Sequence, residues 1–174
     1  KKFGVAVDAM PRSIAIVMDG NGRWATQRGM QRFQGHRQGS RVVERVVLHG
    51  ADIGLECLSL YAFSAQNWKR PMAEVNFLMQ LYTRYLASIR ATLKRQNVRL
   101  VHLGNTNDLP SKVLKELNKT IEQSADNTGM TLALALNYGS REEITSAIQN
   151  IAQEYKDEKI SLADITQDCV DKHL

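Results

Sequence analysis

The chain has 174 residues, of which 43% are hydrophobic and 24% are charged, enough apolar content for one domain with a substantial core. Its formal net charge of +5 favours acidic partners, such as nucleic acid, anionic lipid or phosphorylated small molecules. No apolar run approaches the ~20 residues of a membrane-spanning helix and no signal-peptide pattern opens the chain, which predicts a cytoplasmic protein. Cys57 and Cys169 form neither a metal-ligand spacing nor a CxxC pair, and we interpret both as reduced thiols.

The first elements are a mobile entry segment, residues 1–12, and a short β-branched strand, residues 14–18. A Gly-Asn-Gly turn follows, and then a short helix over residues 23–30. Gly35 and Gly39 are interpreted as breaks in the chain before an amphipathic helix at residues 37–53. Apolar residues recur on one face of that helix at Val42, Val43, Val46, Val47 and Ala51.

A second strand at residues 57–63 ends in a polar loop, residues 64–71. The long helix predicted after Pro71, over residues 72–95, carries a broad apolar stripe between Phe77 and Leu93. This stripe has two interpretations. It packs on the sheet as core, or part of it lines a pocket for an apolar ligand.

The second half of the chain continues the alternation of strands and helices. Its predicted elements are a strand at 98–103, a helix at 111–126, a strand at 131–136, a helix at 141–155 capped by Ser140, and a helical segment after 161. Alternation of this kind predicts a single α/β domain, residues 1–174, with a mostly parallel open sheet flanked by helices. In such sheets the ligand crevice lies beyond the carboxyl ends of the strands. Polar residues follow the predicted strands there, at Asp19, residues 64–67, Gly104-Asn105 and Asn137.

The turn after the first strand has the residue types of an anion site. Gly20 and Gly22 flank Asn21 and free the backbone to aim several N–H groups at one anion. Asp19 stands where a metal ion on that anion would sit, which points to a metal-assisted diphosphate site. A Gly-Asn-Gly turn is also ordinary turn chemistry, so the pattern alone leaves both interpretations open.

Four blocks of the sequence together resemble the cis-prenyltransferase family. They lie in the order and at the spacing of that family, over nearly all of the chain from Pro11 on. The blocks are Met18-Asp-Gly-Asn-Gly-Arg-Trp-Ala25, Arg32 with Gly35-His36 and Gly39, Tyr61-Ala-Phe-Ser-Ala-Gln-Asn-Trp-Lys-Arg-Pro71, and Leu136-Asn-Tyr-Gly139.

The resemblance assigns roles to the matching positions. It implies that Asp19 meets the Mg²⁺-bound diphosphate and acts in its departure, and that Asn67 is the proposed proton acceptor. A neutral amide is a very poor base, so we interpret Asn67 as orienting a diphosphate oxygen or a water instead. Positions that match the substrate-binding residues of the family are Gly20, Asn21, Gly22, Arg23, Trp24, Arg32, His36, Ser64, Ala65, Gln66, Trp68 and Arg70.

The family activity implied is a transferase reaction that adds isopentenyl diphosphate units to an allylic diphosphate such as farnesyl diphosphate. It yields a long polyprenyl diphosphate, the lipid carrier of bacterial wall synthesis. The resemblance further implies Mg²⁺ as cofactor, a homodimer, no nucleic-acid partner and a hydrophobic tunnel for the product. The apolar stripe of the long helix would form the wall of that tunnel, with Ala73 near its mouth and Glu74 close to the site. An apolar product and a positive surface also predict transient contact with an anionic membrane.

Several of these residues have structural alternatives. Asp19 suits a helix N-cap, and Arg23, Arg28 and Arg32 suit a solvated charged face, which is the preferred interpretation for Arg28. Further structural alternatives are a backbone-carbonyl partner for His36, space filling beside Pro71 for Trp68, and structural roles for His49 and His102.

The sequence also departs from the family pattern. Ser13 and Gln66 stand where many members have His and Glu. The later Arg-Thr-x-x-Glu-x-Arg-x-Ser-Asn block of the family, which helps to bind isopentenyl diphosphate, is absent, so we expect the chain to be incomplete. Two other functions stay open: a catalytically idle accessory subunit, and a phospho-ligand or nucleic-acid binder. The latter lacks an arrayed basic helix or a nucleic-acid motif.

Overall fold

A computed structural model describes residues 10–174 as an α/β fold built on one four-stranded sheet. All strand pairs are parallel, and the strand order is β1-β2-β4-β3. The strands are β1 Ser13–Val17, β2 Cys57–Ser64, β3 Arg99–Leu103 and β4 Thr131–Tyr138. Residues 1–9 of the expected mobile segment lie outside the described part of the chain.

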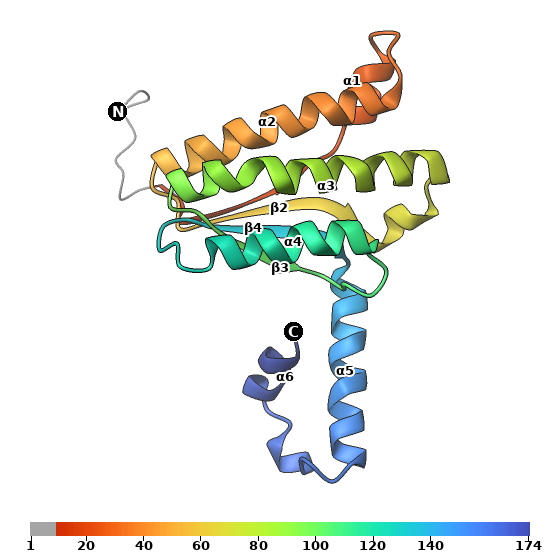
Figure 1. The fold of residues 1–174 in the computed structure, drawn as a ribbon. Helices are drawn as coiled ribbons and strands as arrows, with labels where there is room; N and C mark the ends of the chain where they lie inside the picture. Colours follow the sequence, from red (N-terminus) through yellow and green to blue (C-terminus); the bar gives the residue numbers. More distant parts are fainter. Residues whose placement is uncertain (1–9) are drawn as a thin grey trace.

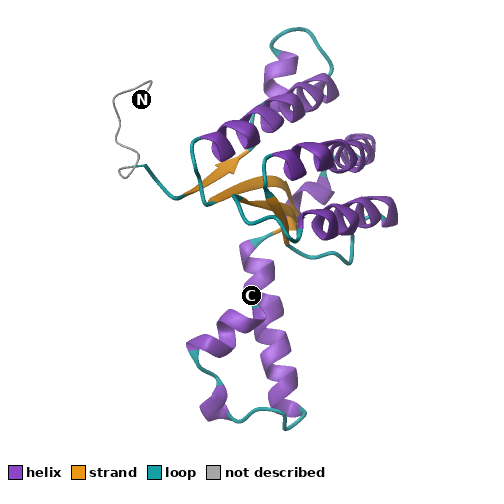
Figure 2. Cartoon of the chain, turned by 60° about the vertical axis from the view of Figure 1, so that its left-hand side comes forward, coloured by secondary structure: helices purple, strands orange, loops and turns teal. Residues whose placement is uncertain are grey.

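Three long helices cover one face of the sheet, whereas α5 extends away from it and α6 lies beside α5 (Figures 1 and 2). Helices α2 and α3 lie next to each other, and α4 follows on the other side of α3. The α-helices are α1 Asn21–Thr26, α2 Arg32–Asp52, α3 Met72–Arg95, α4 Ser111–Ser124, α5 Ser140–Lys156 and α6 Gln167–His173, with 3₁₀ turns η2 Ala65–Lys69 and η3 Leu162–Asp164.

The core lies between the sheet and the three covering helices. In β2, alternate residues Leu58 and Leu60 are buried against the helices, as the period of two in a strand requires. The central strand β4 is buried along nearly its whole length, as expected for a parallel strand with neighbours on both sides. Helix α3 contributes the largest share of buried helical residues, at Val75, Leu78, Met79, Leu86, Ile89, Thr92 and Leu93.

The opposite face of the sheet is covered less. Val17 of β1 is 72% exposed and Tyr61 of β2 is 39% exposed. Within residues 10–174, no helix combines the length and the apolar character needed to cross a membrane.

The predicted α/β class with a parallel sheet is confirmed, and helix α3 begins and ends where the sequence placed it. Several local details differ from the prediction, beginning with α1, which covers Asn21–Thr26 and not residues 23–30. Helix α2 begins at Arg32 and contains Gly35 and Gly39, which therefore do not break the helix as predicted. The polar loop after β2 contains the 3₁₀ turn η2. The N-cap of α5 is Gly139, so Ser140 is the first residue of the helix and not its cap.

Candidate functional site

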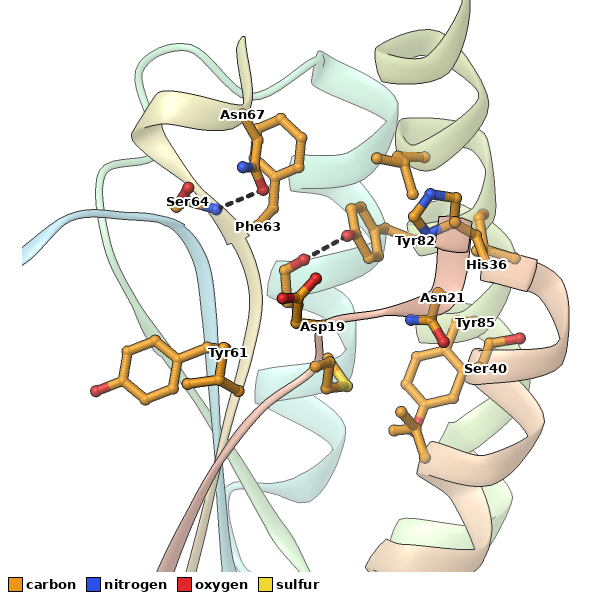
Figure 3. A pocket seen from close by; sticks show the side chains of 18 of the residues that line it. Asp19, Asn21, His36, Ser40, Tyr61, Phe63, Ser64, Asn67, Tyr82 and Tyr85 are labelled. Atoms are coloured by element: carbon orange, nitrogen blue, oxygen red, sulfur yellow. Dashed lines mark hydrogen bonds between the residues drawn. The ribbon is translucent and has the colours of Figure 1, made fainter. Parts of the chain in front are cut away.

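A cavity of about 480 Å³ opens at the carboxyl ends of β1 and β2 and continues between α2, α3 and the sheet (Figure 3). Its mouth is polar, with Asp19, Asn21, His36, Ser64 and Asn67 around it. Its inner part is apolar and is lined by Met18, Val43, Phe63, Leu78, Leu81, Tyr82, Tyr85, Leu86 and Leu134.

The Gly-Asn-Gly turn forms the start of α1 and packs tightly on α2. Gly20 is the N-cap of α1 and has a φ of 85°, in the left-handed region that favours glycine. Gly35 lies so close to the backbone carbonyl of Asn21 that a Cβ on Gly35 would overlap it. A Cβ on Gly39 would lie 2.6 Å from Asn21 Oδ1. These two glycines of α2 therefore allow the turn to sit directly on the helix.

Asp19 lies between β1 and the turn, with its side chain 75% exposed at the cavity mouth. Its Oδ1 accepts a hydrogen bond of 2.5 Å from the Gly20 amide, and its Oδ2 forms an ion pair of 2.9 Å with Arg23. Because Gly20 is the helix N-cap, Asp19 is not, and its carboxylate remains accessible from the cavity.

Three nitrogen-bearing side chains at the cavity mouth converge on one carboxylate, Glu74. Arg32 Nε lies 3.2 Å from Glu74 Oε2, and both His36 Nε2 and Arg70 Nη1 lie 3.2 Å from Glu74 Oε1. Arg32, His36 and Arg70 line the cavity, whereas Glu74 lies behind them. Arg32 and His36 lie on α2 and Arg70 lies in the loop just after η2, so Glu74 of α3 joins its own helix to α2 and to this loop.

Burial and the neighbouring charges set the protonation of this cluster. Desolvation lowers the pKa of His36 below its usual 6.5, although the hydrogen bond to Glu74 acts against this. Burial alone would raise the pKa of Glu74, but hydrogen bonds from Arg32 and His36 outweigh it, so the carboxyl pKa falls below 4.5. At neutral pH the cluster thus holds a neutral imidazole and an ionised carboxylate.

The loop after β2 is held by a capping box. The Ser64 amide donates to Asn67 Oδ1 over 3.2 Å, and the Ser64 hydroxyl accepts from the backbone at Asn67 (Figure 3). Trp68 anchors the same loop, because its Nε1 donates to Asn137 Oδ1 over 2.7 Å and its ring packs edge-on against Phe63.

Asn137 itself is 5% exposed, at the end of β4. It has a left-handed φ of 57°, and its Nδ2 donates to the Asn105 carbonyl over 2.8 Å. Asn137 therefore ties the loop after β3 to the loop after β2.

Two tyrosines of α3 line the inner cavity, and burial raises the pKa of both. The Tyr82 hydroxyl donates to the Ala62 carbonyl over 2.7 Å, at the point where β2 slips register against β4 (Figure 3). The Tyr85 hydroxyl is buried and has no hydrogen-bond partner among the described residues. Both hydroxyls remain protonated at neutral pH, so the inner wall carries no charge from these residues.

The structure brings most of the sequence-predicted site residues to this one cavity. Those that line it are Asp19, Gly20, Asn21, Gly22, Arg23, Arg32, His36, Ser64, Asn67 and Arg70. His36 contacts a carboxylate and not a backbone carbonyl. His102, in contrast, contacts the Leu136 carbonyl at 2.8 Å, as expected for a structural role.

Four predicted site residues lie outside the cavity lining. Trp24 lines an adjoining groove of about 430 Å³ beside α2, which shares Asp19 and Asn21 with the cavity, and Arg28 is stacked 4.5 Å over the Trp24 ring. Gln66 donates to Glu142 Oε1 over 2.8 Å, whereas Trp68 packs partly buried against the core. Ala65 lies near Gly139. The Gly104-Asn105 strand end, expected in the shared crevice, does not line the cavity either.

Sequence reasoning underestimated Glu74 and missed Asn137 as a link between loops. Glu74 was placed only near the site, because a glutamate in the first turn of a helix is ordinary there. The short separation from Arg70 was the available signal, since only four positions part the two residues at the start of α3. No local sequence pattern predicts the contact between Asn137 and Trp68, which are 69 positions apart.

The comparisons with known proteins agree on one family. A family model described as "Putative undecaprenyl diphosphate synthase" matches residues 17–174. An isoprenyl transferase of Shouchella clausii is 46% identical over 165 residues, which cover 95% of this chain and 64% of that relative. A ditrans,polycis-undecaprenyl-diphosphate synthase of Micrococcus luteus, specific for (2E,6E)-farnesyl diphosphate, is 44% identical over 174 residues, which cover 100% of this chain and 70% of that protein.

A solved structure shows the same likeness in three dimensions. Lavandulyl diphosphate synthase from Lavandula x intermedia, in complex with dimethylallyl diphosphate, superposes with a TM-score of 0.90 at 30% sequence identity. The match covers 94% of this chain and 70% of that one. With a family match over residues 17–174 and close relatives at more than 40% identity, this chain belongs to the undecaprenyl diphosphate synthase family of prenyltransferases.

Proposed function

We propose that the protein that carries this chain elongates prenyl chains in cis, by condensing isopentenyl diphosphate onto an allylic diphosphate such as farnesyl diphosphate. The product would be a long polyprenyl diphosphate lipid carrier. The observation that supports this most is the character of the cavity, whose cationic, amide-rich mouth leads directly into an apolar interior. An allylic diphosphate has the same two parts, a charged head and a hydrocarbon tail.

In this proposal the cavity mouth binds the allylic diphosphate. The backbone N–H groups of residues 21–23, together with Arg32, His36 and Arg70, would face the phosphate oxygens. Negative charge grows on the diphosphate as the allylic carbon–oxygen bond breaks, so donors fixed there in advance lower the barrier. The apolar interior would shield the allylic cation from water.

Asp19 is the residue that would hold Mg²⁺. Residues 10–174 contain no cluster of three or more His, Cys, Asp or Glu side chains suited to a metal. Mg²⁺ is commonly held by one or two carboxylates together with substrate phosphates and water, and the accessible Asp19 carboxylate beside the turn fits that arrangement. A bound Mg²⁺ would neutralise charge that develops on the departing diphosphate.

Asn67 would orient a diphosphate oxygen or a water and would not accept a proton. Its amide oxygen is already occupied by the Ser64 amide, so its NH₂ group is what remains for the substrate. An NH₂ group donates hydrogen bonds, which suits a diphosphate oxygen or a water.

Product analysis tests the proposal. The protein at its natural length is incubated with labelled isopentenyl diphosphate, farnesyl diphosphate and Mg²⁺, and the products are sized. We expect elongation, and a loss of at least about a hundredfold in turnover for Asp19→Ala. Asn67→Ala with unchanged turnover would remove Asn67 from the chemistry.

The same assay separates the other functions. An idle accessory subunit would show no elongation alone and would restore or raise turnover in a partner subunit. A phospho-ligand binder would bind inorganic pyrophosphate without elongating any primer. Either outcome would overturn the enzyme proposal.

The proposal also covers the oligomeric state, the location and the membrane contact of the protein. We expect a homodimer in the cytoplasm that meets an anionic membrane only transiently, because the product is apolar and the chain carries a formal net charge of +5. Analytical ultracentrifugation and co-sedimentation with phosphatidylglycerol vesicles at low and high salt would test both.

A further inference from the structure

Glu74 has an unusual place for a carboxylate in a site built for an anion. It lies in the first turn of α3, its side chain is only 13% exposed, and it contacts Arg32, His36 and Arg70 at 3.2 Å each. Those three side chains line the cavity, and Glu74 does not. The carboxylate therefore stands behind the donors on which a phosphate would bind.

We propose that Glu74 is a positioning residue that holds Arg32, His36 and Arg70 in the geometry that binds the allylic diphosphate. The inference rests on the proposed function, because it assigns these donors to the substrate. Two guanidinium groups repel each other, and their long side chains lose rotamer freedom when they are fixed. One shared carboxylate offsets both effects before the substrate arrives, so binding does not have to order the side chains.

The imidazole receives its orientation from the same group. His36 Nε2 faces Glu74 Oε1, and this contact fixes the plane of the ring in a position where it lines the cavity. Arg70 belongs to the loop after β2 and Arg32 to α2. Among the described contacts, Glu74 is the one group that bonds to both side chains.

Electrostatics alone predicts the opposite effect. Glu74 carries a negative charge close to the phosphate site, so removing it raises the local positive charge and would strengthen anion binding. Positioning predicts that removal weakens binding, because the donors lose their common anchor. The sign of the change therefore distinguishes the two roles.

Glu74→Gln is the decisive variant, because it keeps the shape and one acceptor oxygen and removes the charge. Isothermal titration of the natural-length protein with inorganic pyrophosphate, without Mg²⁺, should give a dissociation constant about tenfold higher than in the wild type. An unchanged or lower dissociation constant would overturn the proposal.

Glu116→Gln is the matched control. Glu116 also pairs with an arginine, Arg90, but this pair joins α3 to α4 away from the cavity. The control loses one negative charge and one ion pair, yet its pyrophosphate affinity should stay within about twofold of the wild type. If both variants weaken binding equally, general destabilisation explains the effect and positioning is rejected.

Two further measurements keep the test independent of folding and of catalysis. Glu74→Asp keeps the charge but retracts the carboxylate. Positioning therefore predicts weaker pyrophosphate binding than in the wild type, whereas a purely electrostatic role predicts no change in the dissociation constant. The hydrogen bond that His36 donates to Glu74 raises the pKa of His36, so the imidazole pKa measured by NMR should fall in Glu74→Gln and stay unchanged in Glu116→Gln. An unchanged His36 pKa in Glu74→Gln would contradict the shared anchor.

The outcome does not depend on the elongation assay. If the wild type binds pyrophosphate but elongates no primer, the proposed function fails, and the comparison of Glu74→Gln with the wild type still tests positioning. If elongation occurs and Glu74→Gln binds pyrophosphate as well as the wild type does, the function stands and positioning fails.

Discussion

Asn137 links two loops of the site at the cost of an unfavourable backbone conformation. Replacement by alanine removes its bonds to Trp68 and Asn105 and leaves a left-handed φ that alanine tolerates poorly. We expect Asn137→Ala to lower the free energy of unfolding by about 2–3 kcal/mol, measured by urea denaturation. Asn137→Gly should lose less, because glycine accepts the backbone conformation.

Glu158 provides the control for the backbone effect. It has the same φ of 57° but is exposed, so Glu158→Gly should be neutral or slightly stabilising. If Asn137→Gly proved as stable as the wild type, the two side-chain bonds would be without net value, and the role assigned to Asn137 would be wrong.

At the scale of residues, the sequence predicts what local chemistry determines. The donors of the Gly-Asn-Gly turn and Asp19 follow from residue type and spacing, and the structure places them at one cavity. The exclusion of Trp24 from that cavity does not follow, because its direction depends on how α1 packs on α2. Glu74 likewise shows its role only when α2 and the loop after β2 are brought beside α3.

Helix α3 forms one wall of the cavity, so its apolar stripe should limit the length of the product. Leu81 and Leu86 line the cavity, and tryptophan at either position would fill part of the space for the hydrocarbon. We expect Leu81→Trp and Leu86→Trp to shorten the products seen by chromatography while the first condensation continues.

Ala87 lies on the exposed side of the same helix and serves as the matched control. Ala87→Trp should leave product length unchanged. If the two cavity variants stay active and make products of wild-type length, the stripe is only core and no tunnel wall.

At the scale of elements, hydrophobic period and proline gave the bounds of α3, whereas α2 was misjudged at its start. Glycine has low helix propensity, so Gly35 and Gly39 favoured a break in the local pattern. Packing overrides that preference, because the backbone of Asn21 needs the space at Gly35 and its side-chain amide needs the space at Gly39. The 3₁₀ turn η2 was not predicted for a local reason, since its capping box uses Asn67 where the usual pattern has Glu or Gln.

The stability of the whole molecule should depend on pH through His36. Because burial lowers the pKa of His36 in the folded state, the unfolded chain binds a proton more readily as the pH falls below 6.5. Stability is therefore lost from pH 6.5 down to the folded pKa of this imidazole. Below about pH 4.5, protonation of the Glu74 carboxyl adds a second loss, because its folded pKa is also depressed.

Urea denaturation between pH 7.5 and 5 checks the first step. The wild type should lose stability on acidification, and His36→Asn should lose less over the same range. His173 affects the pH dependence with the opposite sign, because its hydrogen bond to the Cys169 carbonyl raises its pKa, so its protonation stabilises the fold on acidification. The contribution of His36 is therefore taken from the difference between the wild type and His36→Asn. Equal slopes in both proteins would contradict the assignment to His36.

At the scale of the whole molecule, the alternation of elements predicts a parallel α/β sheet but not its strand order. The order β1-β2-β4-β3 requires β4 to insert between β2 and β3, and several crossover paths are compatible with the same pattern of strands and helices. This order places the ends of β1 and β2 side by side and brings Asp19 and Ser64 to the same cavity, while the end of β3 lies beyond it.

Gly35 and Gly39 determine which mutations the first half of α2 can accept. Neither residue has a side chain that could touch a substrate, yet a single methyl group at either position would collide with Asn21. Tolerance to substitution in this part of the helix is thus lowest at its two smallest residues, whereas Arg37 and Arg41, which are exposed, can vary freely as far as packing is concerned. A random mutational scan of α2 would find its most sensitive positions at two residues without side chains, because they shape the turn at the cavity mouth.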